Sequence, residues 1–171
     1  DNGLEVIRLS YPDQHGVLRG KTIMAGEIEQ ALRNGCAITT TLLAKDTSHT
    51  TVFPVFSPGG GFGIPEMENA GDFIAVPVPT TFRLLPWAPG TGWVLCDGYL
   101  ANGEPVPFST RQVLKNAISS LEERGFDYIA GIEVECHIYR LEDPMLRPED
   151  AGQPANPVSY THLTLPTSLI V

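Results

Sequence analysis

Short apolar runs separated by turn residues constrain the fold of this chain most. Residues 4–10 and 17–23 are two such runs, and the segment YPDQHG between them supplies Pro, Asp and Gly, which favour a tight turn. The pattern predicts a β-hairpin. A short helix at 27–34 should follow, and further strands are predicted at 37–43, 73–76, 81–85 and 93–97. The sequence therefore predicts a strand-rich α+β module with one crossing helix.

The pattern changes after residue 100. Ser109 and Gln112 have the spacing of a capping box, and apolar residues then recur at helical spacing over 113–121. This helix leads into an apolar run at 128–139, which we interpret as a buried strand. A helix followed by a strand is typical of the start of a second domain.

Three segments are expected along the chain. Residues 1–99 should form the first domain, and 100–157 the start of a second, truncated one. Residues 158–171 contain no Asp, Glu, Lys or Arg, and the run VSYTHLTLPT resembles the translation of a transposon-end adapter used in sequencing libraries. We expect this tail to be non-native and leave it out of fold reasoning; the alternative is a natural polar strand. The chain is then the N-terminal piece of a longer protein.

Charge and cysteine content limit the function. The chain has 20 acidic and 11 basic side chains and a formal net charge of -9, which argues against binding to nucleic acid or to an anionic membrane. No apolar stretch approaches the ~18 residues that would span a bilayer. Cys36, Cys96 and Cys136 form no C-x-x-C pair, so reduced thiols and a cytoplasmic location are expected.

Two carboxylates stand in the apolar run, in the segment GIEVEC. Glu133 and Glu135 alternate with apolar residues, so on a strand they project from the same face. Two anions about 6–7 Å apart are costly to bury without a counter-charge. A hard divalent cation such as Mg²⁺ or Mn²⁺ would supply it, with further ligands from elsewhere. The alternative is a solvent-facing edge of an amphipathic strand.

Three segments, in the order in which they occur along the chain, resemble segments of one known family. The first is YPDQHGVLRGK, which has the form D-x-x-G-x-x-R-G-K. The second comprises GDFIAVPVPTTFRLLPW and VLCDGYLANGEPVPFSTRQVLK, and the third is GIEVEC. Across residues 3–143 the chain resembles the N-terminal part of the glutamine synthetase family. Arg19 and Lys21 of the first segment are expected on a solvated or subunit-contacting face.

Some positions depart from the family pattern. Val78 stands where the family usually has Asp, Cys136 replaces a Phe, and the loop at 45–70 lacks a D-G-S-S run. These departures point toward the glutamine synthetase-like group that joins glutamate to amines other than ammonia.

The resemblance implies an activity and a fold. Members of this family are ATP-dependent ligases that form an amide at the γ-carboxylate of glutamate through γ-glutamyl phosphate, using ammonia or an amine and divalent ions. An N-terminal β-grasp-like domain packs against the catalytic domain of a neighbouring subunit, so a homo-oligomer is implied. The segment at hand alone is expected to be inactive. The alternatives are a non-catalytic relative with a structural or assembly role, and an unrelated β-rich binding domain.

The resemblance also implies roles for single residues. Glu133 would hold the ion associated with the ATP phosphates, and Glu135 the ion nearer the glutamate substrate. Asp46, in LLAKDTSHT, stands near the place of a loop Asp that binds and deprotonates ammonium in the next subunit's site. Its flanking residues do not match those of the family, so a turn-capping Asp is the alternative.

Overall fold

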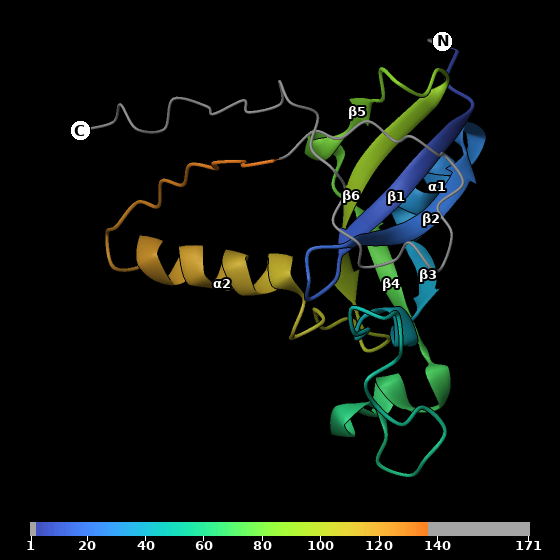
Figure 1. The fold of residues 1–171 in the computed structure, drawn as a ribbon, viewed down its shortest axis with the longest axis vertical. Helices are drawn as coiled ribbons and strands as arrows, with labels where there is room; N and C mark the ends of the chain where they lie inside the picture. Colours follow the sequence, from blue (N-terminus) through green and yellow to red (C-terminus); the bar gives the residue numbers. More distant parts are fainter. Residues whose placement is uncertain (1–2, 137–171) are drawn as a thin grey trace, which may run out of the picture. The chain divides into compact units, whose positions relative to one another are not determined.

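The computed structural model describes residues 3–136 and is built around one mixed β-sheet (Figure 1). The strand order is β2-β1-β6-β4-β3, and the short β5 pairs with β6 beside this path. The strands are β1 (Val6–Pro12), β2 (Leu18–Met24), β3 (Cys36–Thr39), β4 (Asp72–Pro77), β5 (Arg83–Leu84) and β6 (Thr91–Tyr99). The helices are α1 (Ile28–Asn34) and α2 (Thr110–Glu122).

The predicted hairpin is confirmed. β1 pairs antiparallel with β2, and the turn between them spans residues 13–17, so the first two residues of YPDQHG belong to β1. Ile7, Leu9 and Tyr11 are buried on one face of β1, while β2 lies at the sheet edge and is largely exposed. The period-two burial along β1 explains why this run was recognisable as a strand.

β6 is the strand of the sheet that pairs with three others, β1, β4 and β5. Its first half runs parallel to β1 and pairs antiparallel with β5, and its second half pairs antiparallel with β4. The strands predicted at 73–76 and 93–97 are thus confirmed. Two other predictions were too long: the strand expected at 37–43 ends at Thr39, and the one expected at 81–85 is reduced to Arg83–Leu84. The 3-10 turn Thr40–Leu42 takes up most of the rest of the first run, and the 3-10 turn Pro79–Thr81 includes the first residue of the second.

The core lies on the face of the sheet that α1 covers. Ala31 of α1 is buried, and Ile28 packs against the same cluster. Loop residues complete the cluster at one end of the sheet. The buried side chains from loops and 3-10 turns are Leu43, Ala44, Phe53, Met67, Leu100 and Val106.

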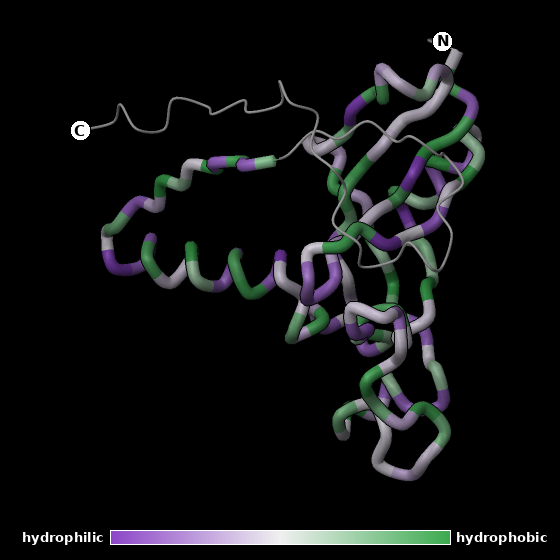
Figure 2. The backbone as a smooth tube through the Cα atoms, viewed as in Figure 1, coloured by the Kyte–Doolittle hydropathy of each residue, from purple (hydrophilic) through white to green (hydrophobic). Residues whose placement is uncertain are grey.

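α2 confirms the predicted helix, but the capping box does not form. The Ser109 side chain makes no cap hydrogen bond, and Gln112 Nε2 donates instead to Asn116 Oδ1 at 2.8 Å. No residue of α2 is buried, and Val113 and Leu114 are about half exposed. Figure 2 shows hydrophobic and hydrophilic residues alternating along this helix. Its apolar stripe therefore has no covering partner among residues 3–136.

Ion pairs attach the start of α2 to the sheet. Asp97 on β6 accepts from Arg111 Nε at 3.0 Å and from Lys115 Nζ. Both Asp97 and Arg111 lie in the segment VLCDGYLANGEPVPFSTRQVLK, 14 positions apart. Two ends of this segment therefore meet in one electrostatic contact.

The strand predicted at 128–139 is not present in its described part. Residues 128–136 have no regular secondary structure and are exposed, and 137–139 lie outside the described residues. A strand needs a hydrogen-bonded neighbour, and none of the six described strands pairs with this run. Residues up to Tyr128 form one compact unit, and Ile129 begins another. No helix within 3–136 is long and apolar enough to cross a membrane.

Candidate functional site

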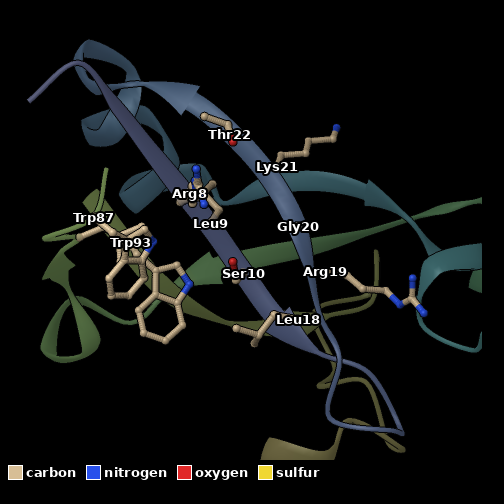
Figure 3. A pocket seen from close by; sticks show the side chains of 11 residues that line it. Arg8, Leu9, Ser10, Leu18, Arg19, Gly20, Lys21, Thr22, Trp87 and Trp93 are labelled. Atoms are coloured by element: carbon tan, nitrogen blue, oxygen red, sulfur yellow. The ribbon is translucent and has the colours of Figure 1, made fainter. Parts of the chain in front are cut away.

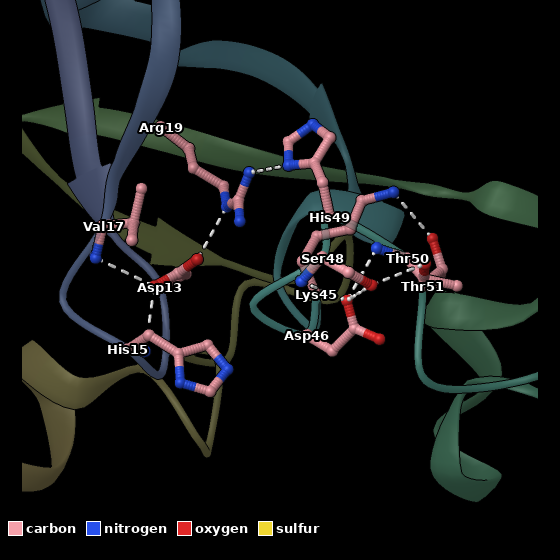
Figure 4. Close-up of polar contacts among 10 residues, drawn as sticks. All are labelled: Asp13, His15, Val17, Arg19, Lys45, Asp46, Ser48, His49, Thr50 and Thr51. Atoms are coloured by element: carbon pink, nitrogen blue, oxygen red, sulfur yellow. Dashed lines mark hydrogen bonds and ion pairs between the residues drawn. The ribbon is translucent and has the colours of Figure 1, made fainter. Parts of the chain in front are cut away.

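Asp46 lies in a tight turn closed by a bridge between Lys45 and Thr51. Its Oδ1 accepts hydrogen bonds from the Ser48 N–H at 2.9 Å, the Ser48 hydroxyl at 2.7 Å and the Thr50 N–H at 2.9 Å (Figure 4). The Asp46 N–H in turn donates to the Thr50 carbonyl at 2.9 Å. Asp46 thus caps its own turn, which is the alternative that the sequence left open.

Turn capping occupies only one carboxylate oxygen of Asp46. Among the described residues, no hydrogen bond reaches Oδ2. The hydrogen bonds from the Ser48 hydroxyl and the Thr50 N–H lower the pKa of Asp46. Asp46 is therefore ionised at neutral pH, with one oxygen able to accept an N–H from a bound molecule.

A buried ion pair holds the neighbouring hairpin turn. Asp13 Oδ1 accepts the N–H of His15 at 2.9 Å and that of Val17 at 3.0 Å, and Oδ2 accepts Arg19 Nε at 2.7 Å. Arg19 Nη1 then reaches His49 Nδ1 at 2.7 Å. Figure 4 shows this chain of contacts running from the hairpin turn to the turn that carries Asp46. The two turns are thus tied together through one guanidinium group.

The ion pair between Asp13 and Arg19 affects the pKa of Asp13. Burial would raise the pKa of Asp13, but the bond from Arg19 and the two backbone N–H groups outweigh it and lower the pKa. Arginine carries only donors, so His49 Nδ1 is the acceptor in its contact with Arg19 Nη1. Arg19 was expected on a solvated or subunit-contacting face; it is not solvated, because its side chain is only 10% exposed and paired with Asp13, and the subunit contact stays a prediction.

Glycines explain the rest of the D-x-x-G-x-x-R-G-K motif. Gly16 has φ +76° in the hairpin turn, a conformation that suits glycine. At Gly20 an added Cβ would lie 1.7 Å from the Leu9 carbonyl oxygen on the paired strand. Lys21 Nζ donates to the Ala37 carbonyl at 2.6 Å. In this structure the motif residues therefore build the hairpin and its contacts.

An open hollow of about 530 Å³ lies beside Asp46. It is lined by Ala44, Val52, Phe62 and Phe108 together with Gln14, His15, Lys45 and Asp46, and nearly all of the surface that it exposes is apolar. Phe62 is 56% exposed, and its ring lies 5.0 Å from that of Phe53 and 6.0 Å from that of Phe108. Sequence reasoning missed this lining. The one available signal was the single aromatic residue in the glycine-rich run PGGGFG.

A second hollow, of about 490 Å³, lies on the outer face of the hairpin (Figure 3). It is lined by Arg8, Arg19 and Lys21 together with Trp87 and Trp93. Trp87 is 75% exposed. None of the predicted site residues lies here.

Glu133 and Glu135 belong to the exposed run that follows the compact unit. Within residues 3–136, no group of three His, Cys, Asp or Glu side chains is arranged to hold a metal ion. Two carboxylates are the ligand type that hard cations prefer, but they are too few for a complete site. The metal role of both residues stays a prediction.

No family model matches the chain, but curated proteins and solved structures do. Over 155 residues it is 41% identical to a γ-glutamylanilide synthase from an Acinetobacter species, covering 89% of this chain and 31% of the relative. Over 159 residues it is 32% identical to a glutamate–isopropylamine ligase from a Pseudomonas species, covering 92% and 33%. The ligand-free structure of GmaS matches with a TM-score of 0.53 at 26% identity, covering 72% of this chain and 24% of that one.

These matches define the class first: the relatives are ligases that form C–N bonds, and the mixed sheet with few helices matches part of such a protein. The chain is a homologue of members of the glutamine synthetase family, which confirms the resemblance. It spans between about a quarter and a third of the length of the curated relatives it matches.

Proposed function

We propose that this chain is the N-terminal part of an ATP-dependent carboxylate–amine ligase. The full-length enzyme would activate the γ-carboxylate of glutamate with ATP as γ-glutamyl phosphate and form an amide with ammonia or an amine. The observation that carries this proposal is the 41% identity to a γ-glutamylanilide synthase across 89% of the chain. The segment alone would be inactive, because it lacks most of the length of its relatives.

Glu133 and Glu135 would contribute carboxylate oxygens to divalent ions in the full-length enzyme. Their ligand chemistry fits Mg²⁺ or Mn²⁺, and the remaining ligands would come from other residues. Bound ions of this kind would neutralise phosphate charge and orient the transferring group. Glu133 is assigned to the ion near the ATP phosphates and Glu135 to the ion near glutamate.

Asp46 would act on the amine. Its carboxylate is ionised and its Oδ2 accepts no hydrogen bond from the described residues, so it can accept an N–H from ammonium or an amine. The module that carries it would be a β-grasp-like domain that completes the site of a neighbouring subunit in a homo-oligomer. Residues from 100 onward would begin the catalytic domain.

The test uses the full-length protein that contains this chain. Phosphate release should require ATP, glutamate, an amine or ammonia, and Mg²⁺ or Mn²⁺ together. Glu135→Ala should lower turnover by about a thousandfold, because metal charge stabilisation is worth several kcal/mol, and should leave the oligomer size unchanged.

Glu29→Ala on α1 is the matched control, because the Glu29 side chain is 82% exposed; its turnover should equal that of the wild type. Normal turnover in Glu135→Ala would refute the metal assignment. Absence of glutamate-dependent phosphate release in the wild type would favour a non-catalytic relative.

A further inference from the structure

We infer that His49 is a positioning residue, whose contact with Arg19 holds residues 45–51, the Asp46 turn, in the orientation in which Asp46 meets the nitrogen donor. This inference rests on the proposed function, because it concerns how Asp46 reaches its substrate. His49 and Arg19 need not touch the substrate themselves. Both act through the turn that carries the carboxylate.

The Asp46 turn is closed by its own hydrogen bonds. The Asp46 N–H donates to the Thr50 carbonyl at 2.9 Å, and the His49 N–H donates to the Asp46 carbonyl at 3.0 Å. Lys45 Nζ donates to Thr51 Oγ1 at 2.8 Å, and three further hydrogen bonds reach Asp46 Oδ1. These contacts fix the shape of the turn. None of them fixes its direction relative to the sheet.

The contact between His49 and Arg19 is the one polar link from the Asp46 turn to another segment among the described residues. Every other hydrogen bond that the turn makes there joins two of its own residues. Arg19 Nη1 donates to His49 Nδ1 at 2.7 Å, and Figure 4 shows the two side chains pointing toward each other from separate segments. Ala44 and Phe53 are buried on either side of the turn, so its tip can pivot about these anchors unless the contact holds it.

Arg19 is a well-fixed donor for this purpose. Its Nε donates to Asp13 Oδ2 at 2.7 Å, and Asp13 is only 2% exposed. Asp13 Oδ1 is held in turn by the N–H groups of His15 and Val17. Because a guanidinium group is planar and its donors form a fixed fork, a fixed Nε also fixes Nη1. The position of the hairpin is thereby transmitted to His49.

The backbone at His49 allows the contact to be changed without changing the turn. His49 has φ +71°, a left-handed conformation that glycine adopts without cost and asparagine adopts readily. His49→Gly therefore keeps the backbone and removes the acceptor. His49→Asn keeps an acceptor as well, because the amide Oδ1 lies as many bonds from the backbone as Nδ1 and accepts from arginine.

The experiment measures steady-state kinetics of the full-length enzyme with ammonium, isopropylamine or aniline as the nitrogen donor. We expect His49→Gly to lower kcat/KM for the nitrogen donor about tenfold, as for loss of one hydrogen bond to a charged group. The KM values for ATP and glutamate should stay within about twofold of the wild type, because uniform binding of those substrates is not touched. His49→Asn should return kcat/KM for the donor to within about threefold of the wild type.

Thr47→Gly is the matched control. Thr47 lies in the same turn and is exposed, and its side chain makes no hydrogen bond to the described residues. The variant adds the same backbone freedom as His49→Gly without removing a contact. All of its kinetic constants should equal those of the wild type.

A double-mutant cycle tests whether His49 acts through Asp46. In the Asp46→Asn background there is no carboxylate left to position, so His49→Gly should change kcat/KM for the donor by less than about twofold. An undiminished loss in that background would overturn the inference. So would an equal fall for every substrate, a failure of His49→Asn to recover activity, or a changed oligomer size of His49→Gly in light scattering. Wild-type kinetics in Asp46→Asn would overturn the inference and leave the ligase assignment intact.

If the wild type released no phosphate with any of the three donors, the proposed function would fail by itself. Amide hydrogen exchange of the full-length protein would then decide whether the contact holds the Asp46 turn. Faster exchange over 45–51 in His49→Gly, but not in His49→Asn or Thr47→Gly, would support it. Any other pattern would overturn it.

Discussion

Removing the Arg19 side chain tests whether the buried ion pair holds the hairpin turn. Asp13 is 2% exposed and the Arg19 side chain 10%, and their contact is 2.7 Å. Arg19→Ala would leave the Asp13 carboxylate buried without its counter-charge, and would also remove the contact to His49 Nδ1. The folded state should therefore be destabilised strongly.

The loss of stability in Arg19→Ala depends on which hydrogen bonds Asp13 retains. Removing one partner of a buried ion pair costs about 3–5 kcal/mol. The N–H groups of His15 and Val17 still donate to Asp13 Oδ1, so the lower end applies, and we expect the free energy of unfolding to fall by about 3 kcal/mol.

Urea unfolding followed by circular dichroism measures this loss. Its control is Arg33→Ala, because Arg33 and Glu29 form a 3.6 Å pair in which both side chains are about 80% exposed. Such a pair contributes less than about 1 kcal/mol. If Arg19→Ala and Arg33→Ala unfold at the same urea concentration, the Asp13–Arg19 contact does not stabilise the fold and the reasoning fails.

The pH dependence adds a second readout. The pKa of Asp13 is lowered in the folded state, since its hydrogen bonds, from Arg19 first, outweigh the effect of burial. A lowered folded-state pKa gives stability that is present above the unfolded value of about 3.9 and is lost as the pH falls through the folded value. The difference in stability between wild type and Arg19→Ala should therefore shrink below about pH 4.

Two further changes test the packing of the sheet and the attachment of α2. Gly20→Ala should lower the free energy of unfolding by about 3 kcal/mol or more, because the added Cβ would meet the Leu9 carbonyl oxygen at 1.7 Å. Gly26→Ala is the control, since a Cβ added there would have no atom within 4 Å. Equal urea midpoints for the two variants would contradict the clash. Asp97→Asn should speed amide hydrogen exchange in 110–122 about tenfold, because it weakens the ion pair to Arg111; unchanged exchange would show that α2 does not depend on this contact.

Local patterns predicted the elements of the sheet well. The hairpin, α1, β4 and β6 follow from period-two or helical spacing bounded by turn residues, which are properties of neighbouring residues. The predicted strand at 128–139 fails over its described part because a strand depends on partners elsewhere, and periodicity does not reveal whether a partner is present. The stripe on α2 was found for the same local reason, but its exposure among the described residues was not predictable.

The site was only partly predictable for a similar reason. Asp46 was named through the resemblance, but its turn-capping contacts depend on Ser48 and Thr50 in a folded turn. Arg19 looked solvated because alternation on an edge strand does not show what a long side chain reaches. Phe62 could not be found from periodicity, because it lies in a glycine-rich loop. Its exposure depends on a backbone conformation with positive φ that the sequence does not reveal.

The contact between Arg19 and His49 links the hairpin motif to the candidate amine site. The two residues are 30 positions apart in sequence, yet their side chains meet at 2.7 Å. His49 follows Asp46 by three residues and donates its N–H to the Asp46 carbonyl at 3.0 Å. The motif residues Asp13 and Arg19 therefore need not touch a substrate to influence the reaction. By fixing His49 they fix the turn that presents Asp46, so a change in the hairpin should alter the position of the carboxylate before it alters any chemical group of the site.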